Sequence, residues 1–173
     1  MSGDNLWITG GIDGISAEDS FSSGQILSDV ELIHIKGIEN EKCRPIALEY
    51  PVHYHSTILT SLGIMTCGGD NRTSVLNACM FQTKEGKTKS FPPMIRSRDR
   101  FGMVVVDQNL IVVGGFWVTN KMEKINLISG QWYEKDLPFM VSSHCVLSIN
   151  DTIVVSIGGW GKMDGEWDVS KIF

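Results

Sequence analysis

The chain has 173 residues, of which 42% are hydrophobic and 20% are charged. These proportions are ordinary for a globular protein, and they exclude a chain that is disordered throughout. The formal net charge of −5 excludes a generic nucleic-acid binder, which would carry a strong basic excess. No apolar run approaches the roughly 20 residues that cross a bilayer, so we expect no contact with a membrane interior.

Four apolar runs along the chain end in a Gly-Gly doublet, and we expect each run to form a β-strand. The doublets are Gly10-Gly11, Gly68-Gly69, Gly114-Gly115 and Gly158-Gly159. Their first glycines are 58, 46 and 44 residues apart. Strand-like units that recur about every 45 residues are typical of β-propeller blades. Glycine suits the end of an inner strand, because it tolerates positive φ and a close backbone approach.

Further strands are predicted around these doublets by short apolar runs between turn-forming residues. In chain order the predicted strands are residues 6–11, 56–60, 64–69, 75–81, 87–91, 101–106, 110–115, 121–127, 131–136, 145–149, 153–159 and 165–173. No segment of ten or more residues has a helical period. We therefore predict an all-β fold of four-stranded antiparallel blades.

The units share a second set of residues. After its doublet, the third unit holds an Ile-Asn pair, a tryptophan seven residues later, a methionine and a histidine: Ile125-Asn126, Trp132, Met140 and His144. The second unit has Met94 and Arg98 as Met-x-x-x-Arg. This pattern resembles the kelch repeat, in which Gly-Gly is followed by Tyr-Asp, Trp, Met and Arg. The resemblance covers nearly the whole chain. It implies a kelch-type propeller in which the doublet glycines and Trp132 are structural.

The predicted propeller is not closed. We expect a partial first blade at residues 1–52, whole blades at 53–92 and 93–137, and a partial fourth blade at 138–173. Closed propellers have 4–8 blades, so strand edges would be left open here. Self-association, or missing blades of a longer chain, would cover them.

One face of the propeller is the predicted binding surface, because loops carry function more often than the scaffold does. Loops between strands 2 and 3, and between strand 4 and the next strand 1, share this face. We place them at residues 12–27, 70–74, 92–100, 116–120, 138–144 and 160–164. The predicted partner-binding residues are Arg96, Arg98, Arg100, His55, His144, Trp117 and Trp160.

Residues 84–100 include six basic and two acidic residues, so an acidic peptide is the predicted partner. The kelch resemblance points to Arg98 and Arg100, because some kelch propellers hold acidic degrons with arginines at these steps. Alternatively, Arg98 is a scaffold residue that binds loop carbonyl groups. Trp117 and Trp160 are either interface anchors or packing residues at the channel mouth.

Metal and cofactor sites are not predicted. His53 and His55 could share a face of a strand, but no further ligands with zinc spacing accompany them. The four cysteines are too scattered for a disulfide framework, and we expect them to be buried free thiols in a reducing, cytoplasmic setting. The N-terminal residues do not resemble a signal peptide.

No catalytic motif occurs in the sequence, so we expect a protein that is not an enzyme. The predicted function is a protein- or peptide-binding module. By resemblance, it would be the substrate-recognition part of a cullin-RING ubiquitin ligase adaptor. The alternatives are an actin or cytoskeletal scaffold, or a fragment of a galactose oxidase-like enzyme.

Overall fold

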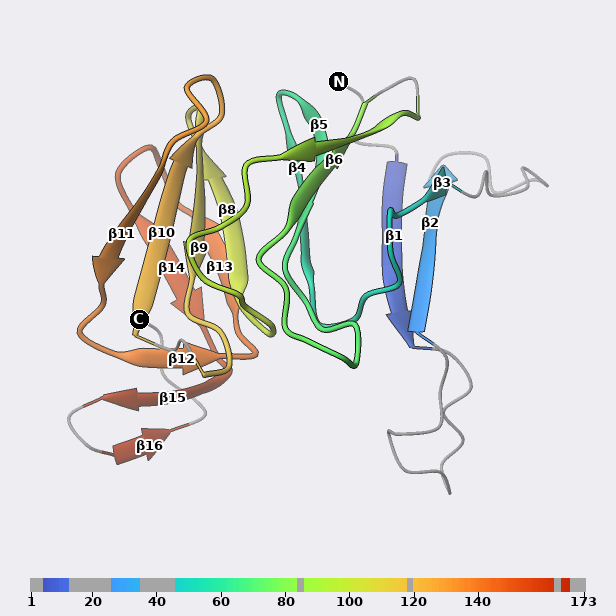
Figure 1. Ribbon diagram of the computed structural model, residues 1–173. Coiled ribbons are helices and arrows are strands. Elements are labelled where there is room, and N and C mark those ends of the chain that lie inside the picture. The colour runs from blue at the N-terminus through green and yellow to red at the C-terminus, as the bar shows by residue number, and fades with distance from the viewer. Residues whose placement is uncertain are drawn as a thin grey trace. The chain divides into compact units, whose positions relative to one another are not determined.

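The computed structural model describes residues 5–12, 26–34, 46–83, 86–117, 120–163 and 166–168. The chain divides into two compact units, Met1–His53 and Tyr54–Phe173. Every regular element in the described residues is a β-strand, which confirms the predicted all-β class (Figure 1). Several predicted features lie partly or wholly outside the described residues: the loops at 12–27, 116–120 and 160–164, the strand at 165–173, and Cys43, one of the four cysteines.

The first unit contains one antiparallel sheet in the order β1-β2-β3. Its strands are β1 (Asn5–Ile12), β2 (Ile26–His34) and β3 (Ile46–Ala47). The first Gly-Gly doublet lies in β1, where the pairing register shifts between Thr9 and Gly11. A bulge at this point is consistent with the conformational freedom of glycine.

The second unit contains two four-stranded antiparallel sheets, in the orders β4-β5-β6-β7 and β11-β10-β9-β8. The strands of the first are β4 (Ser56–Thr60), β5 (Gly63–Cys67), β6 (Cys79–Gln82) and β7 (Thr88–Phe91). Those of the second are β8 (Gly102–Val106), β9 (Asn109–Val113), β10 (Lys121–Asn126) and β11 (Trp132–Asp136). Each sheet is one meander, as the four-strand units of the sequence predict.

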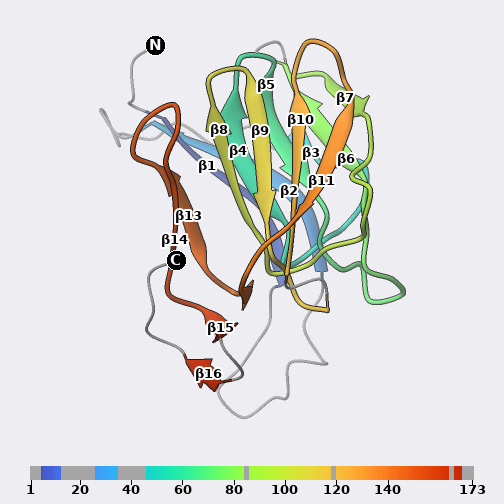
Figure 2. The ribbon, with the colours of Figure 1, turned by 90° about the vertical axis from the view of Figure 1, so that its left-hand side faces the viewer.

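The inner strands of successive sheets lie side by side. β8 packs against β4 on one side and against β13 (Cys145–Ser148) on the other (Figure 2). The core between the two four-stranded sheets includes Met65, Met103, Leu110 and Ile125. Burial of these side chains holds the two sheets together, since each fully buried aliphatic side chain contributes roughly 1.5–3 kcal/mol.

The last part of the chain differs from the predicted partial blade. Among the described strands, β13 pairs only with β14 (Val154–Ile157), in a hairpin. A separate sheet has the order β12-β15-β16, with β12 (Met140–Ser142), β15 (Trp160–Met163) and β16 (Glu166–Asp168). The prediction of loops at 138–144 and 160–164 is therefore wrong at Met140–Ser142 and Trp160–Met163. These residues pair with each other, with Ser142 opposite Trp160.

Two doublets of the second unit, Gly68-Gly69 and Gly114-Gly115, are hydrogen-bonded to the chain segment that follows their own sheet. The Gly69 N–H donates to the Arg98 carbonyl oxygen at 2.7 Å, and the Gly115 N–H donates to the Val141 carbonyl oxygen at 2.9 Å. Gly114 has a φ of +64°, and a Cβ there would lie 2.1 Å from the Val141 carbonyl oxygen. Only glycine fits this position without a shift of the backbone.

These repeated hydrogen bonds also correct the predicted alignment of the units. Met94 N–H donates to the Asn77 carbonyl oxygen at 2.8 Å, and Leu137 N–H donates to that of Asn120 at 2.9 Å. Leu137, not Met140, is thus equivalent to Met94. By the same logic Val141, not His144, takes the place of Arg98. The alignment of the units by sequence is wrong by three residues here, because the segment from Gly114 to Leu137 is three residues shorter than the segment from Gly68 to Met94.

Candidate interaction site on the loop face

Loops of consecutive sheets meet at one end of the second unit, as the antiparallel order predicts. Tyr54, Arg100 and Ser143 each lie two residues before an inner strand, and each has a left-handed φ of 52° to 55°. Arg100 N–H donates to the Tyr54 carbonyl oxygen at 2.9 Å, and Ser143 N–H donates to that of Arg100 at 2.7 Å. The three equivalent residues therefore form a continuous backbone rim.

The Arg100 side chain is held between two aromatic rings. Its guanidinium carbon lies 4.2 Å from the centroid of the Tyr54 ring and 4.9 Å from that of Phe116. The Asp99 carboxylate lies 4.0 Å from the Arg100 Nε. Cation–π contacts of this kind are worth roughly 0.5–2 kcal/mol each, so they fix the guanidinium in place. Arg100 itself remains partly exposed.

Trp117 extends the aromatic surface beyond Arg100. Its ring centroid is 4.8 Å from that of Phe116, and the two rings meet edge to face. Trp117 is 83% exposed and has a φ of 70°, which is uncommon for a bulky side chain. The Phe116 N–H donates to the Asp99 carbonyl oxygen at 2.9 Å, which fixes this loop to the next one. We call Tyr54, Arg100, Phe116 and Trp117 the Arg100 cluster.

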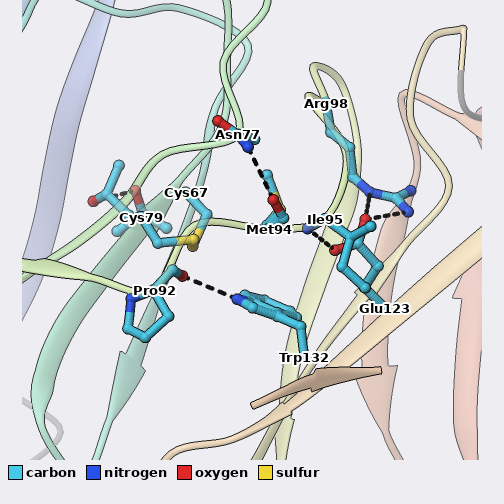
Figure 3. Close-up of a disulfide and its surroundings, with 11 residues drawn as sticks. Cys67, Asn77, Cys79, Pro92, Met94, Ile95, Arg98, Glu123 and Trp132 are labelled. Carbon is cyan, nitrogen blue, oxygen red and sulfur yellow. Dashed lines mark hydrogen bonds and ion pairs between the residues drawn. A yellow bond between two sulfur atoms is a disulfide. The ribbon is translucent and has the colours of Figure 1, made fainter. Parts of the chain in front are cut away.

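Arg98 lies in the interior, only two residues from Arg100. Arg98 and Glu123 are both 0% exposed, and the Arg98 Nε and Nη2 donate to Glu123 Oε1 at 3.0 and 2.8 Å (Figure 3). Arg98 Nη1 also donates to the carbonyl oxygens of Lys121, at 3.0 Å, and of Gly114. Burial lowers the pKa of Arg98, and the Glu123 charge opposes that shift. These contacts favour the scaffold role for Arg98 over the role in partner binding.

Glu123 is the acceptor in this buried ion pair, which we call the Arg98–Glu123 joint. Besides the Arg98 guanidinium, its carboxylate accepts hydrogen bonds from the backbone N–H groups of Ile95, at 2.6 Å, and Arg96, at 3.2 Å. Both oxygens of the buried carboxylate therefore have donors. The joint ties the loop after β7 to strand β10 and so fixes the backbone that carries Arg100.

The Arg96 side chain lies at the outer strand of the sheet and has a different partner from Arg98 and Arg100. It forms an ion pair with Glu134 on β11, and its Nη2 donates to Glu134 Oε1 at 3.1 Å. The hydrogen bond from Arg96 lowers the pKa of the Glu134 carboxyl group. Arg96 is exposed, but Glu134 lies on the outer strand of the sheet and not in the Arg100 cluster.

The remaining predicted residues are spread over the unit. His144 is buried, and burial lowers its pKa to about 4. His55 is half-buried, and Trp160 is exposed at the start of β15. Trp132 packs against the core, and its Nε1 donates to the Pro92 carbonyl oxygen at 2.9 Å. Within the described residues, no three histidine, cysteine or acidic side chains are grouped so that they could hold a metal ion.

The cysteines differ from the prediction. Cys67 and Cys79 are opposite each other on β5 and β6, with their Cα atoms 4.2 Å apart, and they form a buried disulfide (Figure 3). Cys145 is a free thiol but is exposed. The pair was missed because only the strand register brings together two cysteines that are 12 residues apart. Disulfides are typical of oxidising compartments, so the cysteines no longer favour a reducing interior.

Sequence reasoning also missed Tyr54 and Glu123. Tyr54 could have been found, because it stands two residues before β4 as Arg100 stands two residues before β8. Nothing in the sequence marked Glu123 as a buried residue, since a carboxylate in the middle of a strand, next to Lys124, normally faces solvent.

No protein-family model matches the chain, and no curated protein matches its sequence. None of the described residues forms a helix long and apolar enough to cross a membrane. A solved structure titled "Structure of YjhT" is similar to the chain, with a TM-score of 0.69 and 9% sequence identity. The match covers 97% of this chain and 62% of that one, so this chain spans less than two thirds of the matched structure. A likeness at this identity bears on the fold alone, and it supports the β-propeller-like architecture.

Proposed function

We propose that the chain is a protein-binding module without catalytic activity, and that the Arg100 cluster binds an acidic peptide segment. The observation that carries this proposal is the Arg100 guanidinium, which is partly exposed and held between the rings of Tyr54 and Phe116. Three separate loops supply the four residues of the cluster, so the rigid sheets beneath them fix its geometry.

The chemistry of the cluster suits a carboxylate. A guanidinium carries five N–H donors, and two of them can pair with both oxygens of an acidic side chain. The buried joint between Arg98 and Glu123 holds the neighbouring backbone, which lowers the entropy lost when Arg100 binds. Trp117 supplies an exposed aromatic anchor beside the charge, as interface hot spots commonly do.

The resemblance to kelch repeats suggests a finer version of this function. In it, the chain is the substrate-recognition part of a cullin-RING ubiquitin ligase adaptor, and the acidic peptide belongs to the substrate. Such an adaptor works in the cytoplasm, where free thiols are the usual state. The buried position of Cys67 and Cys79 would slow the reduction of their disulfide there.

The test is a titration of fluorescently labelled Asp- and Glu-rich peptides, followed by fluorescence anisotropy. We expect Arg100→Gln and Trp117→Ala each to weaken binding at least tenfold. Arg96→Gln is the matched control, because it removes the same charge from the same loop outside the cluster. Equal losses for Arg96→Gln and Arg100→Gln would reduce the effect to net charge and contradict the proposed site.

A further inference from the structure

The outer edge of β14 has no neighbouring strand among the described residues. β5, β9 and β14 are equivalent, because each ends directly before a Gly-Gly doublet. β5 and β9 each lie between two strands, whereas β14 pairs with β13 alone in the described part of the chain (Figure 1). In an antiparallel pair, every second residue turns its N–H and C=O groups away from the partner strand. The outer backbone groups of β14 can therefore pair with a further strand.

The strands that follow β14 in the chain are paired elsewhere. β10 follows β9 directly and pairs with it, but β15 and β16 follow β14 and form a sheet with β12. The described residues therefore supply no third strand for the β13–β14 sheet. This points to a strand from another molecule.

Ser156 on β14 has a buried hydroxyl group that lacks a partner. The side chain is 3% exposed, and its Oγ has no hydrogen-bond partner among the described residues. Ser156 lies opposite Val146, which faces β8, since a Cβ at Gly102 would lie 2.1 Å from Val146 Cγ2. Native structures rarely leave a buried hydroxyl without a partner, because the loss of its bonds to water costs free energy. A strand beside β14 can supply that partner.

A hollow of about 220 Å³ lies between the second four-stranded sheet and the tip of the hairpin. Its lining residues are Val106, Asp107, Asn109, Ile111, Lys124 and Asp151. Counted from the Gly-Gly doublets, Ile111 is equivalent to Met65, which shares the core with Ile125 of the next sheet. Ile111 is only half-buried, whereas Met65 is 0% exposed. The hollow therefore lies where a third strand beside β14 would place its equivalent of Ile125.

We propose that the outer edge of β14 binds an extended segment of a partner protein, which adds to the hairpin as an antiparallel third strand. In this mode of recognition, main-chain hydrogen bonds give affinity and alternate side chains give specificity. The edge, the buried hydroxyl and the hollow lie together on the side of the hairpin that faces the second four-stranded sheet. This surface is separate from the Arg100 cluster, so either proposal can fail without the other.

The register of β9 and β10 indicates which side chains the segment carries. The residue opposite Ser156 takes the place of Glu123, and the residue opposite Val154 takes the place of Ile125. The first should be uncharged and polar, such as threonine, because Val141 replaces the arginine that pairs with Glu123. The second should be a branched aliphatic residue, which fills the hollow beneath it.

The probe is a fluorescently labelled peptide with the sequence of residues 120–127 and the substitution Glu123→Thr. Its binding to the whole chain is followed by fluorescence anisotropy. We expect saturable binding, and we expect none for a scrambled peptide of the same composition. Hydrogen exchange locates the contact, because the amides of β14 (Val154–Ile157) should exchange several-fold more slowly when the peptide is bound.

Ser156→Ala tests the contact of the hydroxyl group. This variant, and a peptide with valine in place of the threonine, should each weaken binding several-fold. Their combination should be no weaker than either alone, because both remove the same hydrogen bond. Ser148→Ala is the matched control, since Ser148 is an exposed serine on β13, away from the outer edge of β14. Circular dichroism shows whether both variants keep the fold, and Arg100→Gln should leave the binding of this peptide unchanged.

Several results would overturn the proposal. One is the lack of saturable binding, and another is an unchanged exchange rate in β14. Equal losses for Ser148→Ala and Ser156→Ala would also contradict it. Binding that appears only after deletion of residues 169–173 would assign the edge to the chain's own end, and dimers that the peptide dissociates would assign it to a second copy. Either outcome excludes a partner protein as the ligand of this edge.

Discussion

Glu123→Ala tests whether the buried ion pair holds the two four-stranded sheets together. The substitution leaves the Arg98 guanidinium 0% exposed and without its carboxylate. Removing one partner of a buried pair typically costs 3–5 kcal/mol, because the remaining charge keeps its desolvation penalty. Typical domains are stable by about 5–15 kcal/mol, so we expect the loss of a large part of the free energy of unfolding.

The assay is equilibrium unfolding in urea. With a slope near 2 kcal/mol per molar urea, the midpoint should fall by about 2 M in Glu123→Ala. Glu134→Ala is the matched control, since its ion pair with Arg96 is at the surface, where such pairs contribute about 1 kcal/mol or less. The double variant Arg98→Met with Glu123→Leu should recover only part of the loss, because it removes both charges but leaves the backbone N–H groups of Ile95 and Arg96 without their acceptor.

Two results would refute this reasoning. If Glu123→Ala shifts the midpoint no more than Glu134→Ala does, the joint contributes little to stability. If the double variant is as unstable as Glu123→Ala alone, the cost comes from lost packing and from the lost backbone hydrogen bonds to Glu123, and not from an uncompensated charge.

Three further predictions concern other buried groups. Because burial lowers the pKa of His144 to about 4 and an unfolded histidine titrates near 6.5, the unfolded chain binds the proton first as the pH falls. Stability should therefore drop by about 3 kcal/mol between pH 6.5 and pH 4, and thermal melts of His144→Phe should not show this decline. Replacing Cys67 and Cys79 by alanine should lower the free energy of unfolding by about 3 kcal/mol, measured in urea without reducing agent. A wild-type unfolding midpoint that is the same with and without dithiothreitol would contradict the disulfide. Gly114→Ala should lower the melting temperature far more than Gly158→Ala, since both positions have positive φ but a Cβ meets nothing within 4 Å at Gly158; similar melting temperatures would contradict this.

Local signals in the sequence predict the two complete sheets well. Most strands of these sheets are apolar or alternating runs bounded by turn residues, although the outer strands β7 and β11 are largely polar, and each strand pairs with its neighbour in the chain. The last part of the chain was harder to predict, because β12 and β15 pair across the intervening β13–β14 hairpin. Such a pairing depends on register between distant segments, and no local pattern records it.

The candidate site was predicted only in part for a similar reason. The basic run predicted that charge gathers in the loop before β8, but not which arginine would face solvent. That choice depends on partners from other strands and loops. Glu123 of β10 draws Arg98 inward, whereas the rings of Tyr54 and Phe116 hold Arg100 at the surface.

The backbone between Arg98 and Arg100 explains why one side chain is buried and the other partly exposed. In an extended strand, residues two positions apart point to the same side, and a pair of arginines would then form one basic patch. Arg100 has a φ of 53°, so the chain changes direction there, and its N–H reaches back to the Tyr54 carbonyl oxygen. One arginine can therefore lock two sheets together while its neighbour stays available to a carboxylate. The acidic peptide that we propose as the ligand would meet one guanidinium beside two aromatic rings, which requires a more precise geometry of the ligand than a diffuse basic patch would.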